Sequence, residues 1–169
     1  MKACLMMNKM NLIIRNIKTE EYPLLKDYLY DAIFIPQGVK PPDKSIINNE
    51  DLQVYIKDFG SKKDDICFLA EMNHEIVGAV WIRIMNDYGH IDDQTPSLAI
   101  SVKKEYRGLG IGTKLMETML VSVKHHGYQS VSLSVQKANP AVHLYQRLGF
   151  QIIKENEEEY LMKYTERRE

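Results

Sequence analysis

The chain has 169 residues, of which 44% are hydrophobic and 27% are charged, and its formal net charge is -1. This composition is typical of a globular protein with an ordinary core, and we expect residues 11–165 to form one domain. A nearly neutral chain lacks the excess of basic residues that neutralises nucleic-acid phosphates, so no nucleic-acid partner is expected.

The N-terminus and the cysteines bear on where the protein works. Residues 1–10, "MKACLMMNKM", contain an apolar run too short for a signal peptide, and we interpret them as a loose leader. No later segment approaches the ~18 apolar residues of a membrane span, so no membrane partner is expected. Cys4 and Cys67 show neither a CxxC nor a Cys/His spacing, which predicts no metal site and fits a reducing cytoplasm.

The first elements along the chain are a strand and two helices. Residues 11–17 are rich in β-branched side chains and predict a strand. Thr19 is a plausible N-cap for a helix over residues 20–34. Three prolines and a glycine predict a loop over residues 35–51, and a second short helix is expected over residues 51–59.

Three strands are predicted next. Residues 65–72 and 75–85 are apolar strands separated only by Asn73 and His74, and asparagine tolerates the left-handed backbone of a tight hairpin. A polar connection leads to residues 97–102, "SLAISV", which are apolar enough for a central strand.

The second half alternates helices with strands. A helical stripe starts at Ile111 and ends before Gly127, the expected left-handed C-cap. A strand over residues 130–135 leads to a helix with Asn139 as N-cap, Pro140 at its first position and Gly149 after its end. Two more strands, 150–155 and 159–164, close the pattern. The order predicts a mixed α/β sheet with helices on its faces.

The stretch "EYRGLGIGTKL", residues 105–115, connects the central strand to the long helix. Amides at a helix start lack intrahelical partners, and the helix dipole adds partial positive charge there. Glycines let those amides approach a ligand closely. The turn therefore predicts an anion site, most simply for a phosphate.

Two familiar phosphate motifs fail at this turn. Counted from Gly108, both a Walker A loop and a GxGxxG fingerprint require a glycine at position 113, where this chain has Thr113. A nucleotide-phosphate enzyme is therefore disfavoured. The pattern that matches is R/Q-x-x-G-x-G/A, with Arg107, Gly110 and Gly112.

"LAISVKKEYRGLGIGTKLM" followed by "NPAVHLYQRLGF" resembles the GNAT superfamily of N-acetyltransferases. The resemblance covers nearly the whole element order and is sharpest from Ser97 to Phe150. It implies a mostly antiparallel sheet of about seven strands, with helices on both faces. It also implies a central parallel strand pair that splays after a bulge, with acetyl-CoA in the gap.

The resemblance also assigns roles to individual residues. The backbone of Val102 would pair with pantetheine, and its N–H would stabilise the oxyanion. Asn139 would contact the pantetheine arm or the acetyl region, and Tyr145 would act as general acid near the sulfur. The remaining cofactor-binding residues would be Lys103, Lys104, Arg107, Gly108, Leu109, Gly110, Ile111, Gly112 and Thr113. No metal is implied.

The reaction implied is acetyl transfer from acetyl-CoA to a primary amine by direct attack in a ternary complex. The acceptor stays open among small amine metabolites, antibiotics, polyamines and protein N-termini. A non-catalytic acyl-CoA-binding or regulatory domain on the same fold is the alternative. Homodimers are common in the family, so one is possible here.

The group that deprotonates the amine is a second open question. Related sequences often carry glutamate where this chain has Ser97, and serine is a poor base. By position in the sequence, the candidates are Glu71, His90, Asp92 and Asp93, acting through a water relay.

Overall fold

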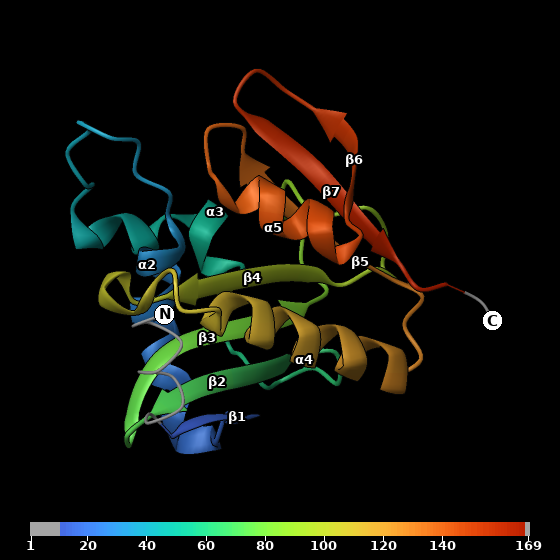
Figure 1. Cartoon of the computed structure of the whole chain (residues 1–169). Coiled ribbons are helices and arrows are strands. Elements are labelled where there is room, and N and C mark those ends of the chain that lie inside the picture. The colour runs from blue at the N-terminus through green and yellow to red at the C-terminus, as the bar shows by residue number, and fades with distance from the viewer. Residues whose placement is uncertain (1–10, 168–169) are drawn as a thin grey trace.

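The computed structural model describes residues 11–167, which form a seven-stranded sheet with helices on both faces (Figure 1). The leader expected at residues 1–10 lies outside the described residues. The strands are β1 (Leu12–Asn16), β2 (Ile66–Met72), β3 (Glu75–Arg83), β4 (Ser97–Val102), β5 (Ser130–Gln136), β6 (Gln151–Glu155) and β7 (Glu159–Thr165). The α-helices are α2 (Leu25–Ala32), α3 (Glu50–Gln53), α4 (Ile111–His125) and α5 (Ala141–Leu148). The 3-10 turns are η1 (Thr19–Leu24), η2 (Lys44–Asn48) and η3 (Lys104–Tyr106).

The sheet order is β1-β2-β3-β4-β5-β7-β6, and β4 with β5 is its parallel pair. The other neighbouring pairs, β1–β2, β2–β3, β3–β4, β5–β7 and β6–β7, are antiparallel. The mixed, mostly antiparallel fold expected from the sequence is therefore confirmed.

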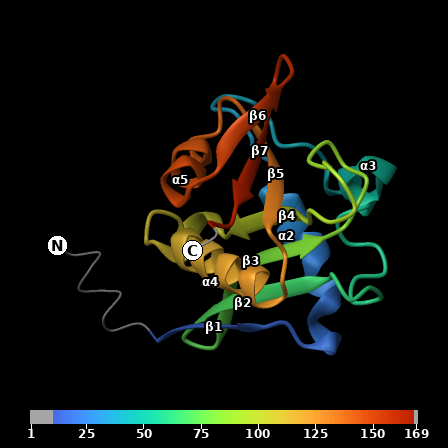
Figure 2. The same cartoon turned by 90° about the vertical axis from the view of Figure 1, so that its right-hand side faces the viewer.

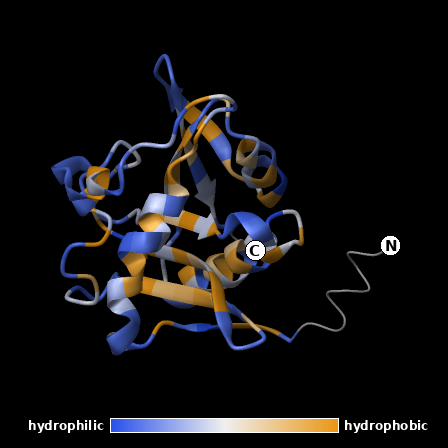
Figure 3. Ribbon diagram, turned by 90° about the vertical axis from the view of Figure 1, so that its left-hand side faces the viewer, coloured by the Kyte–Doolittle hydropathy of each residue, from blue (hydrophilic) through white to orange (hydrophobic). Residues whose placement is uncertain are grey.

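Each face of the sheet packs into its own hydrophobic core. Leu69 and Trp81 point to the face covered by α2, while Ala70 and Val80, their chain neighbours, point to the face covered by α4. This alternation follows from the two-residue period of a strand. Figure 2 shows α4 and α2 on opposite sides of the central strands. In Figure 3 these strands are largely hydrophobic and the outer loops hydrophilic.

Strands β4 and β5 meet at one end only. Their register consists of the single pair Ser97 and Ser132, and the Ser132 amide donates to the Pro96 carbonyl at 2.9 Å. Beyond this point β5 stays paired with β7 along its length, and Figure 2 shows it leaving β4. The expected splay is present, but the expected bulge is not. The β3–β4 register runs without a shift, and β5 leaves β4 while it stays paired with β7.

The N-terminal helix starts differently from the prediction. Lys18, rather than Thr19, is the extended residue before the first turn, and that turn is the 3-10 segment η1. The carboxylate of Glu21 accepts a hydrogen bond from the Lys18 amide at 2.8 Å and so supplies the cap itself. Arg15 holds the same carboxylate through two hydrogen bonds of 2.8 Å.

The second short helix is also shorter than predicted, because side chains of β3 donate hydrogen bonds to the carbonyl groups that would extend it. Helix α3 begins and ends earlier than expected. The carbonyls of Val54 and Lys57 accept hydrogen bonds from the Arg83 guanidinium at 3.1 and 2.9 Å. The carbonyl of Tyr55 accepts from the Trp81 indole at 3.0 Å. Side chains on β3 thus satisfy groups that a longer helix would have used internally.

Several local predictions are confirmed. Asn73 and His74 both have positive φ, 51° and 67°, as a two-residue hairpin requires. Gly127 and Gly149, with φ of 81° and 104°, follow the ends of α4 and α5. Helix α5 begins at Ala141, one residue later than expected, but Asn139 caps it by accepting a hydrogen bond from the Ala141 amide at 2.9 Å.

Candidate functional site

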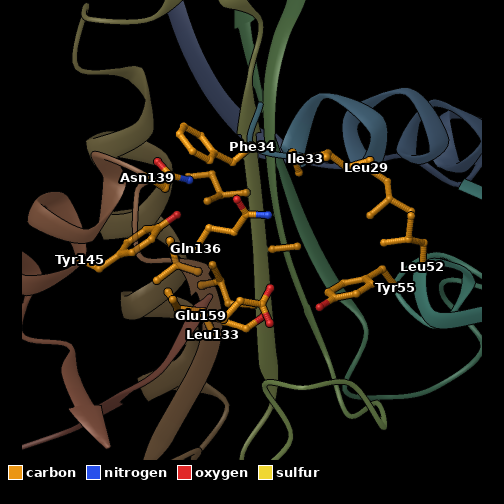
Figure 4. A pocket seen from close by; sticks show the side chains of 16 residues that line it. Leu29, Ile33, Phe34, Leu52, Tyr55, Leu133, Gln136, Asn139, Tyr145 and Glu159 are labelled. Atoms are coloured by element: carbon orange, nitrogen blue, oxygen red, sulfur yellow. The ribbon is translucent and has the colours of Figure 1, made fainter. Parts of the chain in front are cut away.

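A cavity of about 250 Å³ lies where β4 and β5 separate. It is lined by both strands, helix α2 and the segment after it, α3 and the segment after it, Asn139 before α5, Tyr145 within α5, and the first residue of β7. Figure 4 shows Tyr145 and Asn139 on one wall, Tyr55 on the opposite wall and Glu159 between them. The polar lining residues are Tyr55, Ser134, Gln136, Asn139, Tyr145 and Glu159.

One edge of β4 is open toward this gap. The Lys103 amide donates to the Val77 carbonyl at 2.8 Å, which fixes the phase of the antiparallel ladder with β3. In such a ladder alternate residues turn their backbone groups outward, so Ile100 and Val102 direct theirs toward β5. Within the described residues, β5 provides no register partner for either. Val102 therefore presents its N–H to the splayed gap.

The glycine turn continues this open edge. The first helical hydrogen bond of α4 runs from the Lys114 amide to the Gly110 carbonyl at 3.2 Å. The amides of the turn before Lys114 therefore lack intrahelical partners. Gly108 and Gly110 have φ of 78° and 82°. A Cβ at either would meet nothing within 4 Å, so the surface beside the turn is open. A Cβ at Gly112 would make ordinary contact with Leu144 at 3.8 Å.

Two of the basic residues beside the turn, Arg107 and Lys103, already have protein partners in this structure. The Nε of Arg107 donates to the Val102 carbonyl at 2.9 Å, and its Nη2 donates to the Asp31 carbonyl at 3.4 Å. The Lys103 ammonium lies 3.3 Å from the Glu75 carboxylate. Lys104 is exposed. The backbone of the turn, more than these side chains, is arranged to receive an anion.

Tyr145 lies on the α5 wall of the cavity and is 7% exposed. Burial raises its pKa to about 12, so the hydroxyl keeps its proton throughout the physiological range. Its ring packs against Phe150, with the ring centroids 6.0 Å apart. Asn139 shares this wall, so the structure brings the two residues together as the motif predicts.

The predicted candidates for the base lie elsewhere. Glu71 is on β2, with its carboxylate 3.5 Å from Arg15. His90 lies 3.7 Å from Asp93, whose side chain is 92% exposed. Asp92 accepts a hydrogen bond from the Gln94 amide and so shapes a turn. None of the four candidates lines the cavity.

Three residues at or near the cavity, Tyr55, Asp87 and Glu159, were not predicted from the sequence. The carboxylate of Asp87 accepts hydrogen bonds from the Ser97 hydroxyl at 2.9 Å and from the Tyr55 hydroxyl at 2.8 Å. The position of Ser97 therefore has a carboxylate one hydrogen bond away. Glu159, at the start of β7, lines the cavity itself. No motif marks these residues, because they come from segments far apart in the chain.

Two features are absent from residues 11–167. In this part of the chain no helix is both long and apolar enough to cross a bilayer. The same residues contain no group of three or more His, Cys, Asp or Glu side chains placed to hold a metal ion.

The sequence from residue 25 to residue 150 matches the model of the acetyltransferase (GNAT) family. The chain belongs to this family. The open edge of β4, the glycine turn and the Asn139–Tyr145 wall all lie within the matched residues. Helix α2 lies there too, whereas Glu159 lies beyond them.

Two curated proteins show which members of the family this GNAT protein resembles. An N-alpha-acetyltransferase of Sulfurisphaera tokodaii is 34% identical over 111 residues, which cover 56% of this chain and 66% of the relative. A probable N-acetyltransferase camello of Xenopus tropicalis is 36% identical over 91 residues, or 52% and 39% of the two chains. The matched part thus spans slightly under two thirds of the first relative and about two fifths of the second.

Solved structures share the fold of this GNAT protein. The PaiA N-acetyltransferase of Thermoplasma acidophilum, in complex with coenzyme A, superposes with a TM-score of 0.69 at 16% identity. That match covers 92% of this chain and 99% of the other. An acetyltransferase of the GNAT family from Streptococcus pneumoniae gives 0.66 at 24% identity, with the same coverage.

Proposed function

We propose that this GNAT protein transfers an acetyl group from acetyl-CoA to a primary amine. The observation that carries the proposal is the open backbone edge of β4, which runs through Val102 directly into the glycine turn. An extended pantetheine arm would pair with this edge, and its pyrophosphate would meet the turn amides. The CoA complex of the Thermoplasma relative supports the same donor.

The chemical step needs few groups from the protein. The amine nitrogen attacks the thioester carbonyl carbon, the C–S bond breaks, and the acetyl group passes to nitrogen. The outward N–H of Val102 would donate to the oxyanion that develops at the carbonyl. A fixed donor in a dry site is effective because it needs no reorganisation during the reaction.

Tyr145 would protonate the departing thiolate. In water a tyrosine, with a pKa of about 10, is a weaker acid than a thiol at about 8.5. Burial raises the pKa of Tyr145 to about 12. A thiolate in the same apolar cavity is disfavoured for the same reason, so its proton affinity rises as well. The proton affinities of Tyr145 and of the thiolate therefore rise together, and proton transfer between them remains feasible.

The acceptor is proposed at the level of a primary amine. The names of the Sulfurisphaera and Xenopus relatives, both N-acetyltransferases, favour nitrogen as the acceptor. A small amine, an antibiotic, a polyamine and a protein N-terminus all remain compatible with this proposal.

Calorimetric titration with acetyl-CoA, combined with a thiol-release assay over a panel of amines, tests the proposal. We expect acetyl-CoA to bind in the micromolar range or tighter and at least one amine to release thiol. A folded protein that does not bind acetyl-CoA would refute the proposal. Binding without turnover on any amine would instead support a non-catalytic acyl-CoA-binding domain.

A further inference from the structure

The cavity between β4 and β5 contains one charged side chain, that of Glu159. The rest of its lining is aliphatic or aromatic, with hydroxyl and amide groups at a few positions. Within residues 11–167, no arginine, lysine or histidine lines the cavity. A single carboxylate in such a lining favours a ligand that carries one positive charge.

Backbone contacts hold Glu159 where its side chain enters the cavity. Its amide donates to the Asn156 side-chain oxygen at 2.7 Å, and its carbonyl accepts from the Asn156 amide at 3.0 Å. Across the ladder it pairs with Gln136 of β5. Among the described residues, the carboxylate itself accepts no hydrogen bond and forms no ion pair within 4 Å. Figure 4 shows it between the walls formed by Tyr145 and Tyr55.

Asp87 is the contrasting carboxylate. It lies behind the cavity lining, and both of its oxygens accept hydrogen bonds, one from Tyr55 and one from Ser97. The hydroxyl of Tyr55 remains a donor, because burial and the Asp87 charge both raise its pKa. Asp87 is thus committed to holding the wall. Glu159 keeps its oxygens available to a ligand.

We infer that Glu159 is the base that receives the acceptor ammonium and removes its proton, an inference that rests on the proposed function. The proton passes from the ammonium nitrogen to a Glu159 oxygen. The nitrogen lone pair thus released attacks the thioester carbonyl carbon. As the C–S bond breaks, Tyr145 gives its proton to the sulfur, and the second proton that the attacking nitrogen loses restores the Tyr145 hydroxyl. After the acetylated product leaves, the Glu159 carboxyl returns its proton to water, so ammonium and thioester give amide, thiol and one proton.

The surroundings of Glu159 suit this role. Burial raises the pKa of Glu159, and the negative charges of Glu158 on the hairpin and Asp87 on the connection before β4 raise it further. The other titratable groups facing it are Tyr55 and Tyr145, from the two walls. A higher pKa makes the carboxylate a stronger base. It also places the acidic loss of activity above the ordinary glutamate pKa of about 4.3.

The same lining narrows the class of amine. One carboxylate matches one ammonium group, and the absence of a cationic lining residue leaves a second, acidic group on the ligand unpaired. The acceptor is therefore a primary amine carried on an apolar group with no carboxylate beside it. An arylalkylamine and a peptide with an apolar first residue share this chemistry, and a free amino acid does not.

The test compares Glu159→Gln with Glu157→Gln, which alters an exposed carboxylate in the turn of the same hairpin. Glu159→Gln should lower kcat/KM by about 100-fold or more and abolish the acidic limb of the pH profile, with the Kd for acetyl-CoA unchanged. Glu157→Gln should stay within about twofold, and Glu159→Asp should recover part of the rate and restore the acidic limb. An arylalkylamine, a phenylalanyl peptide amide and free phenylalanine form the acceptor panel.

The outcomes separate this inference from the proposed function. If the unaltered protein releases thiol and Glu159→Gln matches its rate and pH profile, the assignment to Glu159 is wrong. Loss of acetyl-CoA binding in both Glu159 variants would make the residue structural and would also overturn it. Acetylation of free phenylalanine as fast as the other two would refute the acceptor class alone. An unaltered protein that binds acetyl-CoA but acetylates nothing would refute the proposed function and this inference together.

Discussion

Burial acts on two ionisable side chains of the cavity, with opposite consequences. It keeps Tyr145 protonated, so this residue has a proton to give. It strengthens Glu159 as a base, so this residue can accept a proton whenever it is ionised. The two side chains lie on different elements of the same cavity. Their positions suit a proton that leaves the amine on one side and another that reaches the sulfur on the other.

Tyr145→Phe tests the donor half of this arrangement. We expect a fall in kcat of about 10- to 100-fold, with little change in the Kd for acetyl-CoA, because the ring and its packing against Phe150 remain. Because the pKa of Tyr145 is raised to about 12, the hydroxyl stays protonated below that pH. The profile of kcat/KM should therefore show no Tyr145-dependent loss up to pH 10. Equal rates for both proteins at every pH would contradict the acid role.

The elements differ in how far their sequence determines them. The hairpin at Asn73, the glycine turn and helix α4 follow from local patterns, and all three are present. Helix α3 does not follow, because Arg83 and Trp81 take carbonyls that a propensity argument assigns to the helix. Arg83 is also 4% exposed and paired with the buried Asp65 at 3.2 Å. Such long-range contacts leave no signal in a single sequence.

The two sides of the candidate site also differ in how far the sequence predicts them. The donor side is built from one continuous stretch, Val102 to Tyr145, so a motif could identify its residues in advance. The acceptor side combines Tyr55, Asp87 and Glu159, which come from three separate segments. Ser97 gave the one hint, since it stands where related sequences often have a carboxylate. Only the fold reveals that Asp87 occupies the neighbouring position.

The glycine turn offers a matched pair of substitutions. Gly110→Ala forces an alanine into φ of 82°, which costs about 1 kcal/mol or more and shifts the turn amides. It should weaken acetyl-CoA binding about fivefold or more in a calorimetric titration. Gly112→Ala keeps an ordinary helical backbone, and its Cβ only contacts Leu144 and Val102. It should bind acetyl-CoA nearly as tightly as the unaltered chain. Equal weakening by both would show that strain in the turn is not the cause.

At the scale of the whole molecule, the sheet consists of two ladders joined at a single parallel pair, Ser97 with Ser132. One ladder contains β1 to β4, and the other contains β5, β7 and β6. A ligand pairing with β4 while contacting the α5 wall would connect the two. Binding to the folded state alone adds stability, about 2.7 kcal/mol at a ligand concentration one hundred times Kd.

Hydrogen exchange would locate that added stability. In acetyl-CoA, amide exchange should slow most at Ile100, at Val102 and in the glycine turn. The amides of β1 and β2, which are already paired on the far side of β3, should change least. A thermal shift should accompany the protection. Uniform protection throughout residues 11–167, with no maximum along β4, would contradict the proposed position of the pantetheine arm.

The single pair between β4 and β5 has one further consequence, for behaviour in solution. An unpaired strand edge invites another chain to add a strand, and proteins usually cover such edges at the margin of a sheet. Here the edge at Ile100 and Val102 lies in the middle of the sheet, and Ile100 lines the cavity of about 250 Å³. Strands β5, β7 and β6 lie beyond this edge, so another chain cannot extend the sheet from it as it could at a margin. We therefore expect the edge to stay available to a ligand without promoting self-association.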